Sequence, residues 1–108
     1  MAKWLLLVET NSTDAAREAE FNEWYDKIHV PDILEAPGVI RATRYENPKP
    51  QEGKGKFLAI YEIESDNIKE TMKAISDNMV KKKAQGRHSE ILALVSQAVY
   101  RQTSSMSK

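Results

Sequence analysis

The chain has 108 residues, and its 16 lysines and arginines balance its 16 aspartates and glutamates. This length is typical of one domain, and the balanced charge argues against nucleic acid as a partner, because phosphate binding depends on a basic face. The absence of cysteine excludes disulfides, thiolate metal sites and a cysteine nucleophile, and it is typical of a cytoplasmic protein.

The first expected element is a strand over residues 4–8, a short apolar run rich in leucine. This run is far too short to span a bilayer, and it lacks the small-residue cleavage site of a signal peptide. We therefore expect no membrane association and a mature chain that starts at residue 1. The polar cluster 11–14 that follows favours the start of a helix.

The next expected element is an amphipathic helix that begins near Asp14. Its apolar positions recur at helical spacing on one face: Phe21, Trp24, Tyr25 and Ile28. Pro31 cannot continue a regular helix without the loss of a backbone hydrogen bond, which predicts a break near His29. A short turn over residues 32–36 is expected after the break.

The central part of the sequence predicts two strands joined by a loop. Pro37 and Gly38 mark a turn, and residues 39–45 then read as a strand. Residues 47–56 carry two prolines, two glycines and several charges, a composition typical of a solvated loop. Residues 57–63 form the next expected strand.

The last third of the chain predicts a second helix and a fourth strand. Ser65 and Asp66 stand where an N-cap is expected, and Gly86 stands just past the expected C-terminal end. A single helical stripe joins the apolar positions between them: Ile68, Met72, Ile75 and Met79. A strand over residues 91–95, extending to about residue 100, precedes a polar tail at 103–108.

This order of elements predicts an α+β domain over residues 1–102 with the ferredoxin-like βαββαβ topology. Its four-stranded antiparallel sheet carries both helices on one face. The strands have apolar side chains at consecutive positions, such as Leu5 and Leu6, so both faces of the sheet are apolar. A second copy of the chain is expected to cover the other face in a homodimeric α+β barrel. The alternative is a smaller apolar face and a monomer.

The segment 20–32, together with Pro37, Gly38 and Val39, resembles the dimeric α+β barrel superfamily, and it is most similar to EthD-like proteins and the small bacterial barrels near them. The superfamily includes cofactor-free monooxygenases, polyketide cyclases, muconolactone isomerases and haem-dependent enzymes. The resemblance implies a ligand cleft between the sheet and the helices, with His29 at or near its mouth. The haem-dependent members match poorly, because His88 is expected in a charged turn and not in a pocket.

The residues themselves single out His29 as a candidate acid or base. Tyr25 lies one turn earlier and Asp32 three residues later, so a histidine oriented by a carboxylate is conceivable. In the alternative interpretation, His29 ends the helix and donates to its last carbonyls, and Asp32 caps the following turn. Tyr61 is the third expected catalytic residue, as a hydrogen-bond donor.

Four further residues are expected to bind the substrate: Trp24, Tyr25, Arg41 and Tyr45. Trp24 and Tyr25 belong to the apolar helix stripe, so core packing is the alternative role for Trp24. Two histidines far apart in a chain without cysteine give too few ligands for a metal site. No organic cofactor is expected either.

The expected function is that of a cofactor-free acid–base enzyme of the lyase, isomerase or cyclase type. Its substrate would be a small, oxygenated, partly apolar metabolite. The alternatives are a non-catalytic dimer that binds a small molecule or acts as an accessory protein, and a cofactor-free monooxygenase. The expected partners are a second copy of the chain and a small organic ligand, with neither nucleic acid nor membrane.

Overall fold

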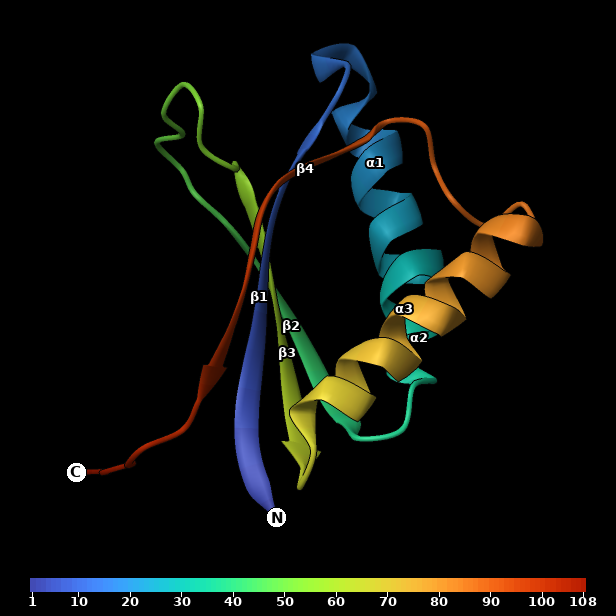
Figure 1. Ribbon diagram of the computed structural model, residues 1–108. Helices are drawn as coiled ribbons and strands as arrows, with labels where there is room; N and C mark the ends of the chain where they lie inside the picture. Colours follow the sequence, from blue (N-terminus) through green and yellow to red (C-terminus); the bar gives the residue numbers. More distant parts are fainter.

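The chain folds into one antiparallel sheet with all its helical segments on one side, as the computed structural model in Figure 1 shows. All 108 residues are described. The strands follow the spatial order β2-β3-β1-β4, and their bounds are Ala2–Ser12 for β1, Val39–Glu46 for β2, Phe57–Ser65 for β3 and Leu92–Arg101 for β4. The predicted α+β ferredoxin-like fold is confirmed.

Alternation along the strands separates a core face from an open face. In β3, Phe57, Ala59, Tyr61 and Ile63 are buried, whereas the residues between them are only half-buried. Tyr61 pairs with Leu6 of β1 and with Ala42 of β2, so these three residues share the face that the helices cover. The opposite face carries Leu58 and Ile60 of the same strand.

Strand β1 is longer than the predicted apolar run because its polar end is paired. Asn11 and Ser12 lie opposite Ala93 and Leu92 of β4, so they belong to the sheet and not to a helix cap. Asp14 does act as a cap, since its side chain accepts a hydrogen bond from the Ala16 amide.

The first helix does not break near His29, and that prediction is wrong. A 3₁₀ turn, η1 (Ala15–Arg17), leads into α1 (Glu18–Trp24), a π-helical turn, η2 (Tyr25–His29), and α2 (Val30–Leu34) without interruption. The amide of Val30 bonds to the carbonyl of Tyr25, five residues back. The wider π-turn accommodates Pro31, which would clash in a regular α-helix. His29 is therefore inside a helical run, and the alternative that it ends a helix is also wrong.

The N-cap of helix α3 (Ile68–Ala84) is one residue later than the predicted cap at Ser65 and Asp66. The side chain of Asn67 caps the helix by accepting from the Glu70 amide. Ser65 belongs to β3 instead, and its buried hydroxyl accepts from the Thr71 hydroxyl at 2.7 Å. Gly86 adopts a φ of 75° just past the helix end, as predicted for a residue in the left-handed region.

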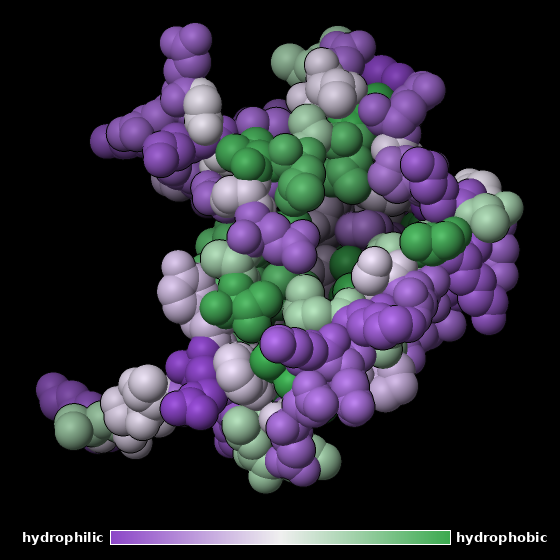
Figure 2. Space-filling model, in the orientation of Figure 1, coloured by the Kyte–Doolittle hydropathy of each residue, from purple (hydrophilic) through white to green (hydrophobic).

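The core lies between the sheet and the helical layer. The predicted stripe of α3 packs against it, with Ile75 buried. On the face seen in Figure 2, apolar side chains gather between the sheet and α3, and hydrophilic side chains surround them. Residues after Gln102 form no helix or strand and are exposed. None of the helices is long and apolar enough to cross a membrane.

Candidate functional site

His29 sits in an aromatic environment built by the π-turn. Its ring stacks on Trp24 with centroids 4.8 Å apart, and the edge of Tyr25 meets it at the same distance. The indole nitrogen of Trp24 donates to the carbonyl of Arg87 at 3.0 Å, which ties the helix to the loop after α3. Stacking and this hydrogen bond together fix the imidazole against the helix.

Burial is the main cause of an unusual protonation equilibrium at His29. Burial and, next in size, the neighbouring His88 lower the pKa of the imidazole to about 4. Asp32 raises the pKa and Arg44 lowers it, both by smaller amounts. His29 is therefore a neutral imidazole at physiological pH, able to accept a proton.

A cavity of about 280 Å³ borders His29. Its lining comes from α2, α3, the loop after α3 and the π-turn, and comprises His29, Asp32, Ser76, Met79, Val80, Lys82, Lys83, Arg87 and His88. No strand contributes to it. The cavity thus lies between helical segments, whereas the resemblance implied a cleft between the sheet and the helices.

Asp32 does not orient His29, in contrast to the expectation. This carboxylate is only 4% exposed, and its two oxygens accept from Nε and Nη2 of Arg87 at 2.8 and 2.9 Å. Lys82 Nζ lies 3.9 Å from the same carboxylate. No hydrogen bond joins the Asp32 carboxylate to His29. The Asp32 side chain does not cap a turn either. It positions Arg87 in the cavity wall.

Tyr61 lies behind the site and not in the cavity. It is fully buried on the helix-covered face of β3, and its hydroxyl lies near that of Tyr25 without a hydrogen bond of good geometry. The hydroxyls of Tyr25 and Thr10 are buried without partners as well. Burial is the main cause that raises the pKa of Tyr61 and of Tyr25, so both stay protonated at physiological pH.

Two of the expected substrate-binding residues are on the other side of the sheet. Arg41 pairs with Glu62 at 3.5 Å and its side chain is 72% exposed, and Tyr45 is 54% exposed. Both share the open face with Leu58 and Ile60. Neither residue contacts His29. The arginine near the aromatic side chains of the first helix is Arg44, whose guanidinium carbon lies 4.1 Å from the Tyr25 ring centre.

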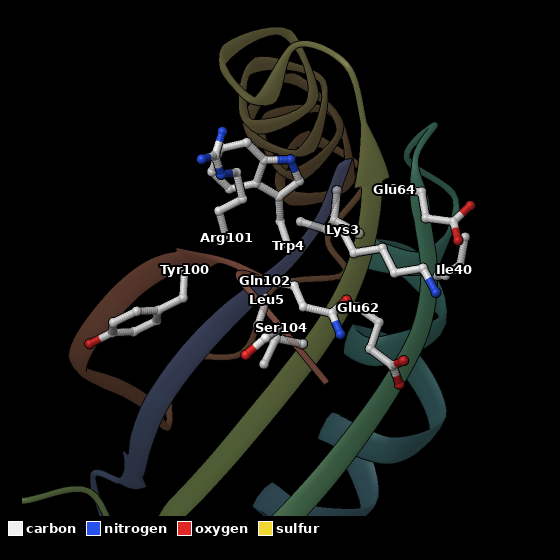
Figure 3. Close-up of a pocket in the computed structure, with 11 residues that line it drawn as sticks. Lys3, Trp4, Leu5, Ile40, Glu62, Glu64, Tyr100, Arg101, Gln102 and Ser104 are labelled. Atoms are coloured by element: carbon white, nitrogen blue, oxygen red, sulfur yellow. The ribbon is translucent and has the colours of Figure 1, made fainter. Parts of the chain in front are cut away.

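A second cavity, of about 380 Å³, opens near both chain ends (Figure 3). Its lining includes Lys3, Leu5, Glu62 and Glu64 from the open face, with Ser104 from the tail. Figure 3 shows Arg101 beside Trp4, whose ring centre lies 6.0 Å from the guanidinium carbon. Neither histidine lines this cavity. We therefore place the candidate site beside His29.

The sequence interpretation missed three residues of the site, and it misplaced one of them. His88 was expected in a charged turn away from any pocket, yet it lines the cavity with His29. Lys83 and Arg87 line it as well. Nearly sixty residues separate this loop from His29 in the sequence, so no local pattern could have joined them. No group of three or more His, Cys, Asp or Glu side chains is placed to hold a metal ion.

No family model matches the sequence, and no curated protein is similar to it. Solved structures do share its fold. HapK from Hahella chejuensis has a TM-score of 0.69 and 14% identity, with 97% of each chain covered. An EthD family protein from Bacillus halodurans C-125 has a TM-score of 0.53 and 16% identity, covering 95% of this chain and 100% of that one.

SnoaB from Streptomyces nogalater, a cofactor-independent oxygenase, has a TM-score of 0.55 and 12% identity, with 99% of this chain and 97% of SnoaB covered. Three further structures of this fold are dimeric ferredoxin-like proteins. The chain therefore shares the ferredoxin-like fold of these proteins. At these identities the similarity defines the fold alone.

Proposed function

We propose that the chain is a cofactor-free acid–base enzyme in which His29 takes a proton from a small, oxygenated, partly apolar metabolite. The observation that carries this proposal is the position of His29, whose imidazole is held by Trp24 and Tyr25 in the wall of a 280 Å³ cavity. Its pKa is lowered to about 4, so the imidazole is neutral at physiological pH. A base of this kind needs no deprotonation before it acts. The cavity also offers apolar surface from Met79 and Val80.

The roles of the surrounding residues follow from their contacts. Trp24 and Tyr25 hold the imidazole ring, so they are positioning residues. Asp32 positions Arg87, which is a candidate donor to a substrate oxygen. After His29 removes a proton, return of that proton to another atom would give isomerisation, and loss of a leaving group would give elimination.

A cofactor-free monooxygenase is the second candidate, and the shared fold with SnoaB favours it. The first step would be the same removal of a proton by His29. The resulting carbanion or enolate would then react with dioxygen, instead of being reprotonated. A non-catalytic binding protein would use the same cavity without either step.

Turnover of a panel of phenolic, lactone and keto-acid compounds tests the proposal. We expect His29→Gln to lower kcat/KM for any compound that reacts by at least about 100-fold, because general base catalysis contributes on this scale. Product analysis with and without dioxygen separates the two candidate reactions. The matched control is Lys81→Gln, which changes a residue of α3 outside the cavity lining and should retain most activity. Equal activity of wild type and His29→Gln would contradict the proposal.

We also propose that two copies pair through the open face of the sheet. This face carries exposed or half-buried apolar side chains from all four strands, including Ile40, Leu5, Ile60 and Tyr100. Exposed apolar surface of this kind commonly marks a protein contact. Three structures of the same fold are dimeric, which supports the same arrangement here.

Ile60→Glu is expected to convert the dimer to a monomer of half the mass. Ile60 lies near the centre of the open face, opposite Leu7 of β1 and Thr43 of β2, so an added carboxylate would be buried without a partner. Light scattering coupled to gel filtration measures the mass. The matched control, Val80→Glu, changes an exposed apolar residue of α3 and should remain dimeric. A wild-type monomer, or a dimeric Ile60→Glu protein, would refute this pairing.

A further inference from the structure

The cavity beside His29 is lined by more positive than negative side chains. Lys82, Lys83 and Arg87 face a single carboxylate, that of Asp32. Lys82 is already paired with Glu35 at 2.7 Å. Arg87 uses Nε and Nη2 on Asp32, which leaves its Nη1 without a protein partner, and Lys83 forms no ion pair. Two cationic groups of the wall therefore keep donors for a ligand.

Apolar groups line the same cavity. Met79 and Val80 of α3 offer them, and Trp24 stacks against His29 just outside. A bare inorganic anion would accept hydrogen bonds from the cationic donors and leave this apolar surface exposed to water. A compound with one anionic end and one apolar body would use both.

We propose that this cavity binds a small carboxylate-bearing compound, with its carboxylate on Lys83 and Arg87 and its apolar body against Met79 and Val80. The inference rests on the proposed function, because it names the substrate class of the same site. Asp32 fixes the plane of the Arg87 guanidinium by two hydrogen bonds, so this cation is oriented before the ligand arrives.

A carboxylate in this cavity would also strengthen His29 as a base. The groups that act most on His29 are His88 in the loop, Asp32 in α2 and Arg44 in β2, with the phenol of Tyr25 beside it. The cations Lys82, Lys83 and Arg87 line the same cavity. Positive charge among these groups helps to keep the pKa of His29 at about 4, which is low for a general base at neutral pH. An added negative charge nearby favours the imidazolium and raises this pKa. The bound substrate would thus raise the pKa of the histidine that deprotonates it.

The test compares two probes of nearly the same shape on the full-length protein. Benzoylformate is a keto acid that stays ionised over the acidic range, and benzoylformamide is its uncharged amide. NMR signals of the His29 imidazole, assigned with His29→Gln, report binding and pKa together. We expect benzoylformate to raise the pKa of His29 from about 4 to about 5 or above. The amide should bind more weakly and leave the pKa unchanged.

A pair of lysine variants locates the anion. Lys83→Gln is expected to weaken benzoylformate binding about five-fold, the scale of one partly exposed ion pair. Lys81→Gln, on the same helix but outside the cavity lining, should have no effect. Equal binding of acid and amide, or equal effects of the two lysine variants, would overturn the inference.

The two proposals fail separately. Charge-selective binding with the expected rise in the pKa of His29, but without turnover of any compound, would support the carboxylate site and contradict the enzyme. Turnover of neutral compounds only, with loss of activity in His29→Gln, would support the enzyme and overturn the carboxylate site. Inorganic phosphate as a third probe should bind more weakly than benzoylformate, and tighter phosphate binding would also overturn the inference.

Discussion

Phe21→Ala is expected to lower the free energy of unfolding by about 4 kcal/mol. Phe21 is completely buried, and its ring packs on Tyr25 and Phe57 with centroids 5.6 and 5.5 Å apart. The loss combines the transfer of the aromatic ring to water with the cavity left between α1 and β3. Urea unfolding followed by circular dichroism measures it.

The same substitution should also disturb the candidate site. Tyr25 rests on Phe21 on one side and contacts His29 on the other. A cavity beside Tyr25 therefore loosens the wall that holds the imidazole. Val80→Ala is the matched control, because Val80 is 68% exposed on α3 and should change stability by less than about 0.5 kcal/mol. A loss below about 1 kcal/mol for Phe21→Ala would mean that this aromatic core is not packed as described.

The order of the elements could be predicted because each strand and helix carries its own local period. The boundaries that failed depend on contacts far along the chain. Asn11 and Ser12 read as a helix cap by composition, but pairing with β4 keeps them in the sheet. Ser65 likewise continues β3 because it pairs with Ala2 at the start of β1.

The helix break near His29 failed for a different reason. The rule that proline ends a helix holds for a regular α-helix, where the ring meets the carbonyl four residues back. A π-turn changes that spacing, and no pattern in the local sequence predicts such a turn. The turn matters for the site, because the helix that contains it presents His29 to the cavity and continues into α2, which carries Asp32.

The candidate site was predictable only where it is local in sequence. Helical spacing places Tyr25 beside His29, and the structure has this contact. The partner of Asp32 was not predictable in the same way, because Arg87 comes from a loop 55 residues later. Alternation along β2 correctly separates Arg41 and Tyr45 from Arg44, but a strand pattern alone does not say which face the helices cover.

Acidification is expected to destabilise the protein through His29 by about 2 to 3 kcal/mol. Burial lowers the pKa of this imidazole from 6.5 to about 4 in the folded state, so the folded chain binds fewer protons than the unfolded chain between these values. The stabilising contribution is therefore fully present above about pH 6.5 and is lost as the pH falls through about 4. Residual hydration of the half-buried ring keeps the loss below the full value for this shift.

Comparison with His29→Gln isolates this contribution, because every carboxylate of the chain titrates in both proteins. Urea unfolding at a series of pH values should show wild type losing its advantage over His29→Gln as the solution is acidified. Parallel stability curves for wild type and His29→Gln would mean that His29 protonates as easily in the folded chain as in the unfolded one. In that case burial would not disfavour the charged form of His29, and the proposed proton abstraction would rest on the turnover of His29→Gln alone.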